Sequence, residues 1–281
     1  MSNLATRTIS GVLFVIITVA AIYCGAVSFV VLFAAISAVC VWEFCTLVNS
    51  RKGLQVNRMI CTVAAVYLFL AVMAFNTAAV GAMIFVPYVL TTVYLLISEL
   101  YLKRPNPFEN WAMAFASQLY IALPVALINV VAFRTNPYYA SVSYIYELPL
   151  ALMVFLWMND MGAYCCGSLL QKYIPLKLFP SISPHKSWIG SIGGAIITLA
   201  SSLAFAHFFP IMSLSKWLGM ATVVVVFGTW GDLVESQLKR TLGVKDSGKF
   251  LPGHGGALDR FDSSLLAIPC VVIYFYSLEL M

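Results

Sequence analysis

The residues best suited to chemistry lie in the second half of the chain. All five aspartates follow residue 150, in a sequence of 281 residues that is 62% apolar. Asp160 and Asp232 lie inside or beside apolar runs, where a carboxylate costs roughly 2.5 to 3.5 kcal/mol unless it has a partner or a watery cavity. Solubilising charges would be scattered more evenly. The candidate functional carboxylates are therefore Asp160, Asp232, Asp246, Asp259 and Asp262.

One pattern among these residues predicts a shared helical face. If the apolar run that leads to Asp232 continues as a helix, Asp232, Glu235 and Lys239 project from one side, because spacings of three and four residues return to the same face. We expect this helix to end before Gly243, since glycine readily adopts the positive φ found at helix ends.

A second pair of carboxylates begins the last apolar run. Asp259 and Asp262 are three residues apart, so a helix that starts there would aim both side chains in one direction. Paired carboxylates suit Mg²⁺, which takes one or two ligands from the protein and the rest of its shell from water and substrate phosphates. The pair is therefore a candidate part of a metal site.

The segment between these carboxylates, residues 239–256, is basic and rich in glycine. Such a loop can surround a polyphosphate with ammonium, guanidinium and backbone N–H groups, and its glycines allow close approach. An anchor for anionic lipid headgroups would explain the Lys and Arg residues, but not the glycines, His254 or the aspartates among them. Carboxylates and cations together favour phosphoryl or nucleotidyl transfer, in which catalysis is mainly positioning and charge neutralisation.

The composition indicates that lipid surrounds most of the chain. Only 10% of the residues are charged, whereas about 25% is usual in a soluble domain. A helix needs about 20 apolar residues to cross the hydrocarbon, and on this basis we expect an all-α polytopic membrane protein with about nine transmembrane helices. The apolar run 10–48 divides in two near Gly25, and further spans are expected at 59–75, 79–98, 111–133, 148–168, 188–209, 217–233 and 263–281.

The positions of the basic residues predict the orientation. Fourteen of the sixteen Lys and Arg residues fall in alternate connections, and only Arg134 and Lys216 fall in the others. Because cytoplasmic loops are enriched in positive charge, we expect a cytoplasmic N-terminus, an external C-terminus and an active site at the cytoplasmic face of the inner membrane. The net charge of +5 reflects this orientation, so no nucleic-acid partner is expected.

Nothing in the sequence divides the chain into soluble domains, because it has no fixed-period repeat, low-complexity stretch or long polar linker. We expect one membrane domain over 1–281, with N-terminal transmembrane helices in 1–135 and a catalytic half in 148–281. Two long polar connections, 171–187 and 235–262, belong to the catalytic half and are expected on the cytoplasmic side.

Two sequence blocks closely resemble the signature of the phosphatidate cytidylyltransferases, or CDP-diglyceride synthases. The first block contains the lead-in Gly231-Asp232-Leu233-x-Glu235-Ser236, then Ser236-x-Leu238-Lys239-Arg240, Lys245-Asp246-x-Gly248 and Leu251-Pro252-x-His254-Gly255-Gly256-x-x-Asp259-Arg260-Phe261-Asp262. The second contains Asp160-x-Gly162-Ala163-Tyr164 and Ser183-Pro184-x-Lys186-Ser187-Trp188-x-Gly190. The resemblance covers residues 155–265, and it departs from the usual pattern at Met161, Ile189 and Ala257. Ile189 replaces a glutamate often found beside the Ser-Pro-x-Lys loop.

The resemblance implies a reaction and a set of cofactors. In this family the phosphate of phosphatidic acid attacks the α-phosphorus of CTP, which yields CDP-diacylglycerol and pyrophosphate in phospholipid biosynthesis. The reaction depends on Mg²⁺, and members are thought to use a metal pair that can include K⁺. Members are also reported to form homodimers within the bilayer.

Roles for particular residues follow from the same resemblance. The implied metal ligands are Asp232 and Asp259, then Asp262 and Asp160, whereas Asp246 is either catalytic or structural. The implied phosphate-binding residues are Lys239, Arg240, Lys245, Gly255, Gly256, Ser183 and Lys186. His254 is expected to bind phosphate or fix the loop, because a phosphate monoester is already largely ionised at neutral pH and needs no general base.

Two other classes of function stay open. A polytopic transporter can also have aspartates inside the membrane, but it needs no Lys- and Gly-rich cytosolic loop. A cytidylyltransferase or kinase that acts on another lipid would differ mainly in the lipid tail that it binds.

Overall fold

The structure is a computed structural model, and it describes residues 3–135, 142–248, 250, 253 and 255–278. Its contacts define two compact units. Unit 1 contains Met1–Tyr146 and Leu242–Phe261, and unit 2 contains Glu147–Thr241 and Asp262–Met281. The segment 242–261 therefore belongs to unit 1, although it follows the helices of unit 2 in the sequence.

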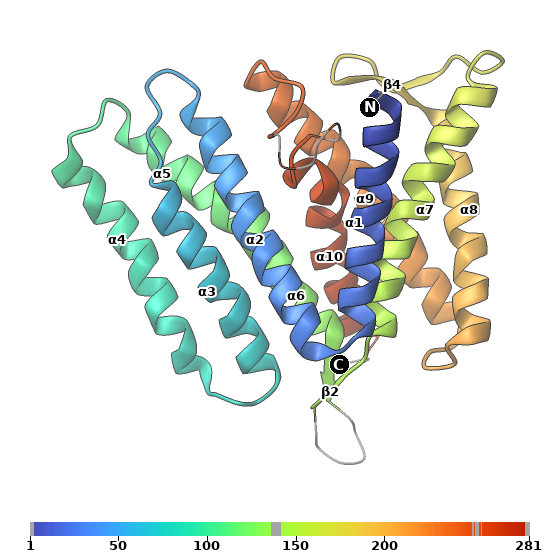
Figure 1. Cartoon of the computed structure of the whole chain (residues 1–281), viewed down its shortest axis with the longest axis horizontal. Coiled ribbons are helices and arrows are strands. Elements are labelled where there is room, and N and C mark those ends of the chain that lie inside the picture. Colours follow the sequence, from blue (N-terminus) through green and yellow to red (C-terminus); the bar gives the residue numbers. More distant parts are fainter. Residues whose placement is uncertain (1–2, 136–141, 249, 251–252, 254, 279–281) are drawn as a thin grey trace. The chain divides into compact units, whose positions relative to one another are not determined.

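Unit 1 consists mainly of long apolar helices. They are α1 (Asn3–Tyr23), α2 (Ala26–Asn49), α3 (Arg58–Asn76), the 3-10 helix η1 (Ala82–Phe85), α4 (Val86–Leu102), α5 (Pro107–Ala116), the π-helix η2 (Ser117–Ala122) and α6 (Leu123–Ala132). A short antiparallel hairpin follows, in which β1 (Phe133–Thr135) pairs with β2 (Val142–Tyr144). Figure 1 shows α2, α3 and α4 side by side. Large side chains of α2 and α3, including Phe29, Phe33, Phe44 and Phe69, are fully or almost fully buried.

Local sequence explains where the first helices of unit 1 begin and end. Gly25 separates α1 from α2 with φ +126°, a conformation that is easily accessible only to glycine. The expected division of the run 10–48 therefore falls at this residue. Asn57 caps the start of α3, and its side-chain oxygen accepts a hydrogen bond from the Ile60 N–H at 3.2 Å, which satisfies one of the free donors of the first turn.

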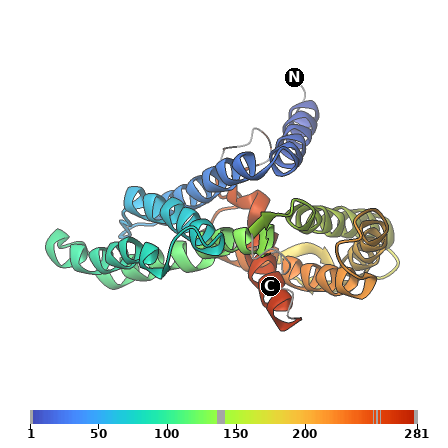
Figure 2. The same ribbon diagram turned by 90° about the horizontal axis from the view of Figure 1, so that it is seen from below.

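Unit 2 contains three long helices, a short β-hairpin and most of a fourth helix. The second strand of the hairpin, Ser183–Ser187, belongs to the second sequence block. The elements of unit 2 are α7 (Glu147–Leu170), β3 (Lys177–Phe179), β4 (Ser183–Ser187), α8 (Trp188–Phe208), α9 (Leu214–Thr241) and the part of α10 (Leu258–Ser277) that follows Phe261. Figure 2 shows α7, α8 and α9, coloured from yellow-green to orange, lying side by side. Glycines permit this packing, because a Cβ on Gly162 would lie 2.9 Å from the Cα of Gly194.

These helices confirm the prediction of an all-α polytopic membrane protein. Among the described residues, seven helices are long and apolar enough to cross a membrane, and α1 contains a shorter apolar stretch at Thr8–Tyr23. The nine expected spans overlap, in order, α1, α2, α3, η1–α4, α5–η2–α6, α7, α8, α9 and α10. Of these, α1 and α10 are not among the seven. The hairpins β1–β2 and β3–β4 were not expected, since each strand is only three to five residues long. The orientation in the membrane stays a prediction.

Candidate active site

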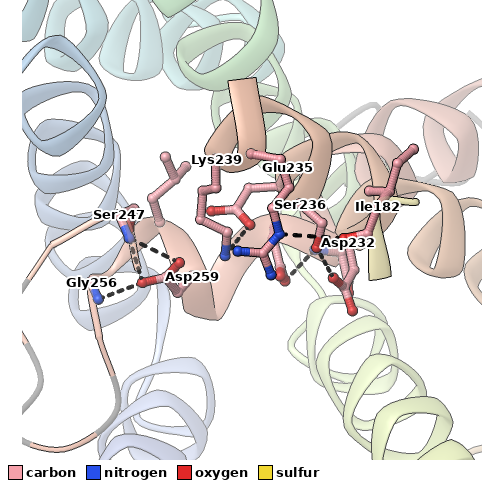
Figure 3. A network of polar contacts seen from close by, with 12 residues as sticks. Ile182, Asp232, Glu235, Ser236, Lys239, Ser247, Gly256 and Asp259 are labelled. Atoms are coloured by element: carbon pink, nitrogen blue, oxygen red, sulfur yellow. Dashed lines mark hydrogen bonds and ion pairs between the residues drawn. The ribbon is translucent and has the colours of Figure 1, made fainter. Parts of the chain in front are cut away.

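The C-terminal part of α9 carries the predicted polar face. The helix continues to Thr241, and Gly243 beyond it has φ +71°, so both predictions about this helix end are confirmed. Lys239 Nζ lies 2.5 Å from Glu235 Oε2, and the Ser236 hydroxyl donates to Asp232 Oδ1 at 3.2 Å. Figure 3 shows these side chains projecting from one side of the helix. The pairing holds the Lys239 ammonium beside a fully buried carboxylate.

The β3–β4 hairpin of unit 2 contacts the same helix. Lys186, in β4, places its Nζ 2.5 Å from Asp232 Oδ2. The Arg240 Nε–H donates to the carbonyl oxygen of Ile182 at 3.4 Å. Both Lys186 and Asp232 are partly exposed, at 24% and 29% of their side-chain area. The connection 171–187 therefore contacts α9. The contact joins Lys186, a predicted phosphate-binding residue, to Asp232, a predicted metal ligand.

Asp262 adds a further carboxylate to unit 2. It lies in the second turn of α10, half-buried, where its Oδ1 accepts the N–H of Ser263 at 2.6 Å. Burial and the nearby carboxylates of Asp232, Glu235 and Asp160 raise the pKa of Asp262 well above its ordinary range. Asp232, Glu235 and Asp160 are thus near enough to Asp262 to act on its carboxylate, and negative charge of this kind favours cations.

The glycine before Asp232 allows α9 and α10 to approach closely within unit 2. A Cβ on Gly231 would lie 2.7 Å from the carbonyl oxygen of Asp262 and 3.0 Å from the Cα of Ser263. A larger residue would push the two helices apart, and with them the carboxylates of Asp232 and Asp262. Close packing of α9 against α10 therefore explains why a glycine precedes Asp232.

In unit 1, Asp259 accepts hydrogen bonds from the loop between α9 and α10, residues 242–257, here called the signature loop. Its Oδ2 accepts the N–H groups of Gly256 at 2.7 Å and Ser247 at 2.9 Å, and its Oδ1 lies 3.2 Å from the same Ser247 nitrogen. Figure 3 shows these bonds. Asp259 is 8% exposed, and Gly255 approaches it with φ +85°, so that a Cβ there would lie 2.5 Å from Oδ2. The carboxylate thus determines the shape of the backbone around it.

Sequence reasoning missed one residue of this loop environment, Glu43. It lies in α2, is 8% exposed, and its Oε2 accepts the N–H of Leu258 at 3.0 Å and the Ser247 hydroxyl at 3.4 Å. Glu43 is the only charged residue of α2, a helix of 24 residues. The cost of a carboxylate within an apolar run, which identified Asp160 and Asp232, also applies to Glu43 and could have identified it.

The structure divides the predicted site residues between the units. Unit 2 contains Asp160, Asp232, Asp262, Ser183, Lys186, Lys239 and Arg240, and unit 1 contains Lys245, Asp246, Gly255, Gly256 and Asp259. Lys245 and Asp246 are exposed. His254 lies outside the described residues. The individual catalytic, phosphate-binding and metal-binding roles stay predictions.

The oxygen ligands in unit 2 fit the chemistry of Mg²⁺. In the part of the chain that the structure describes, no group of three or more His, Cys, Asp or Glu residues lies close enough to hold a metal ion. Mg²⁺ does not require such a group, because one or two carboxylates usually suffice when water and substrate phosphates complete the shell. Asp232 and Asp262, which share one negative field, offer this kind of ligand set.

Fold and composition define a polytopic membrane protein, with its aspartates concentrated in unit 2 and in segment 242–261. The sequence pattern of the Cytidylyltransferase family matches residues 5–278. The chain belongs to this family.

Curated relatives agree with this assignment. The chain is 45% identical to the phosphatidate cytidylyltransferase of Staphylococcus aureus (strain COL) over 122 residues, which are 43% of this chain and 45% of that protein. It is 47% identical to the phosphatidate cytidylyltransferase of Staphylococcus haemolyticus over 119 residues, 42% and 44% of the two chains. With the Staphylococcus saprophyticus enzyme of the same name it shares 44% identity over 139 residues, 46% and 52% of the two. The chain spans about half the length of the curated relatives that it matches.

Proposed function

We propose that the chain is a phosphatidate cytidylyltransferase, which forms CDP-diacylglycerol and pyrophosphate from CTP and phosphatidic acid. The observation that carries the proposal is the contact between Lys186 and Asp232 at 2.5 Å. It joins the two sequence blocks that resemble this class of enzyme. Family membership and relatives of that name support the same reaction.

The bond changes follow from the substrates. A phosphate oxygen of phosphatidic acid forms a bond to the α-phosphorus of CTP, and the bond from this phosphorus to the oxygen bridging to the β-phosphorus breaks. Pyrophosphate leaves with that bridging oxygen. The attacking phosphate has a second pKa near 6, so it is largely ionised at neutral pH without a general base. The protein must therefore supply positioning and positive charge more than proton transfer.

Unit 2 offers groups for the charged phosphates. Asp232 and Asp262 would hold Mg²⁺, with Asp160 nearby, and K⁺ is proposed as a second metal. The metal would neutralise phosphate charge and polarise the reacting phosphorus. Lys186 and Lys239 each lie beside a carboxylate, which keeps an ammonium group at the site. Arg240 and Ser183 would complete the phosphate contacts.

Unit 1 offers the loop that would bind the CTP triphosphate. Lys245 supplies a charge, and the glycines around Gly255 and Gly256 let backbone N–H groups approach the phosphates. Asp259 accepts loop N–H groups, and a carboxylate has about four lone-pair sites. It can therefore fix the loop and still act as the metal ligand that the resemblance implies.

The setting of this site is also part of the proposal. The distribution of Lys and Arg supports a site at the cytoplasmic face of the membrane, and we propose that this is the inner membrane. Phe250 is 60% exposed and lies in the signature loop, so a Phe250→Cys variant should react with a membrane-impermeant thiol reagent only from the cytoplasmic side. Labelling from the outside would invert the topology. A homodimer is proposed from the resemblance, and crosslinking in the membrane tests it.

A panel of nucleotides and lipids tests the reaction itself. Protein purified in detergent should convert CTP and phosphatidic acid to CDP-diacylglycerol when Mg²⁺ is present, and chelation should stop the reaction. The panel should include ATP, GTP and UTP, phosphorylated isoprenoid lipids, and diacylglycerol with ATP. Turnover of another phospholipid only, or of diacylglycerol with ATP, would identify a different lipid transferase or a kinase. No turnover of any pair would contradict the proposal.

A further inference from the structure

Glu43 is a buried carboxylate whose hydrogen-bond partners lie far away in the sequence. It accepts the N–H of Leu258, 215 residues later, at 3.0 Å, and the hydroxyl of Ser247, 204 residues later, at 3.4 Å. A buried carboxylate is costly without such partners. Ser247 belongs to the signature loop and Leu258 begins α10 directly after it, both in unit 1. The two ends of the loop therefore stabilise Glu43, and Glu43 is in a position to stabilise the loop.

Two glycines of the loop pack directly against this carboxylate. A Cβ on Gly248 would overlap Oε1 of Glu43, and a Cβ on Gly256 would overlap Oε2 and the Ser247 hydroxyl. Neither glycine has a positive φ, in contrast to Gly255 with φ +85°. Gly248 and Gly256 are therefore required by the space that Glu43 occupies, and not by their backbone conformation.

Glu43 and Asp259 act on the same loop positions in a complementary way. At Ser247, Asp259 accepts the backbone N–H and Glu43 accepts the hydroxyl. At the other end of the loop, Asp259 accepts the N–H of Gly256 and Glu43 accepts the N–H of Leu258. Each end of the loop is thus held by both carboxylates.

We propose that Glu43 is a positioning residue that holds the signature loop in the shape that binds the nucleotide triphosphate. This inference rests on the proposed function for its kinetic consequence. If Glu43 is lost, the loop must be ordered when CTP binds, and that cost weakens binding. Glu43 itself would contact neither the metal nor the reacting phosphorus, so its loss should change KM for CTP more than kcat.

The first test compares two buried glutamates of unit 1. Glu43→Ala should raise KM for CTP by roughly tenfold, because it removes two hydrogen bonds to the loop. Glu99→Ala is the matched control, since Glu99 is 7% exposed and bonded to Arg104 at 2.7 Å and Asn110 at 3.0 Å. It should lower thermal stability without changing KM. An unchanged KM in Glu43→Ala, or an equal rise in both variants, would overturn the proposal.

A conservative variant separates hydrogen bonding from general stability. Glu43→Gln keeps an oxygen that can accept the Leu258 N–H, so its rise in KM should be clearly smaller than that of Glu43→Ala. The same rise in both would reject the role of Glu43 as a hydrogen-bond acceptor for the loop. If Glu43→Ala cannot be purified folded, Gly248→Ala provides the same perturbation from the loop side and should raise KM for CTP.

A second measurement does not depend on catalysis. Hydrogen exchange of peptides that cover 244–258 should accelerate in Glu43→Ala and stay close to wild type in Glu43→Gln and Glu99→Ala. Unchanged exchange in Glu43→Ala would show that the loop does not depend on Glu43. If wild-type protein turns over no CTP but Glu43→Ala accelerates exchange, the proposed function fails while the anchoring of the loop stands.

A double-mutant comparison tests whether Gly256 and Glu43, which pack against each other, affect KM for CTP together. Gly256→Ala should raise KM for CTP in the wild-type background, because the new methyl group displaces the Glu43 carboxylate and the Ser247 hydroxyl. In the Glu43→Ala background the same change should cost several-fold less. Fully additive effects would mean that Gly256 and Glu43 act independently, which contradicts the proposal.

Discussion

The carboxylates of the two units differ in what they bind. In unit 1, Glu43 and Asp259 accept backbone N–H groups of the signature loop. In unit 2, Asp232 and Glu235 lie 2.5 Å from the ammonium groups of Lys186 and Lys239. A carboxylate that binds backbone determines the shape of a loop, whereas one that binds a mobile side chain can exchange that partner for a metal or a phosphate-bound cation. We therefore infer loop shaping in unit 1, where Asp259 is also the metal ligand that the resemblance implies, and charge chemistry in unit 2.

Asp259 is the residue on which this comparison can fail most clearly. We expect Asp259→Asn to reduce kcat by more than about 100-fold, the scale of losing one preorganised electrostatic contact in a transition state, while the protein stays folded. The measurement is product formation at saturating CTP, with circular dichroism as the folding check. Retained kcat with a raised KM would remove Asp259 from the metal site and leave it with the loop-shaping role alone. Glu109→Gln, an exposed carboxylate in α5, is the control.

Lys186 tests the charge chemistry of unit 2. Lys186→Met should lower kcat/KM by roughly 10- to 100-fold, because it removes a charge-assisted contact worth about 1.5 to 3 kcal/mol. Its melting temperature should change little, since partly exposed ion pairs contribute little to stability. Steady-state kinetics and thermal unfolding of the same preparation check both statements. A loss of stability with normal kinetics would mean that Lys186 only holds the hairpin against α9.

Alanine variants of two glycines with positive φ, Gly255 and Gly243, distinguish the effect of backbone strain from the effect of contact with Asp259. Gly255→Ala and Gly243→Ala both force a side chain into the left-handed region, which costs roughly 1 to 2 kcal/mol. Only the Cβ at 255 would lie 2.5 Å from Asp259 Oδ2, and at 243 there is nothing within 4 Å. We therefore expect KM for CTP to rise several-fold in Gly255→Ala and to stay near wild type in Gly243→Ala. Equal effects would assign the loss to backbone strain alone.

Asp262 provides the smallest expected effect, on stability. Its pKa is raised by burial and by Asp232, Glu235 and Asp160, so between its ordinary and its folded pKa the folded state binds more protons than the unfolded state. Stability is therefore favoured at low pH and decreases as pH rises through the folded pKa. Without Mg²⁺, Asp262→Asn should melt a few degrees above wild type at pH 8, and the difference should shrink toward pH 5. If the difference in melting temperature were the same at every pH from 5 to 8, the proposed effect of the neighbouring carboxylates on Asp262 would be contradicted.

Much of the fold could be predicted from the sequence because the signals are local. Apolar length located the helices, Gly25 and Gly243 located two of their ends, and the spacing of Asp232, Glu235 and Lys239 predicted a common face. Each depends on the geometry of one helix or one backbone torsion. The same local reasoning identified the aspartates and the loop 239–256, the family resemblance added Ser183 and Lys186, and neither identified Glu43.

The pairings among these residues were decided only by tertiary structure. Lys186 meets Asp232 because the β3–β4 hairpin lies against α9, and a strand of three to five residues has too little periodicity to predict. Glu43 meets Leu258 across 215 residues, a separation over which no helical or strand period applies. The sequence by itself determined an all-α polytopic protein with acidic and basic residues concentrated in two blocks. The tertiary structure determined that some carboxylates shape a loop and others face ammonium groups, because the partner of a buried charge depends on which elements pack together.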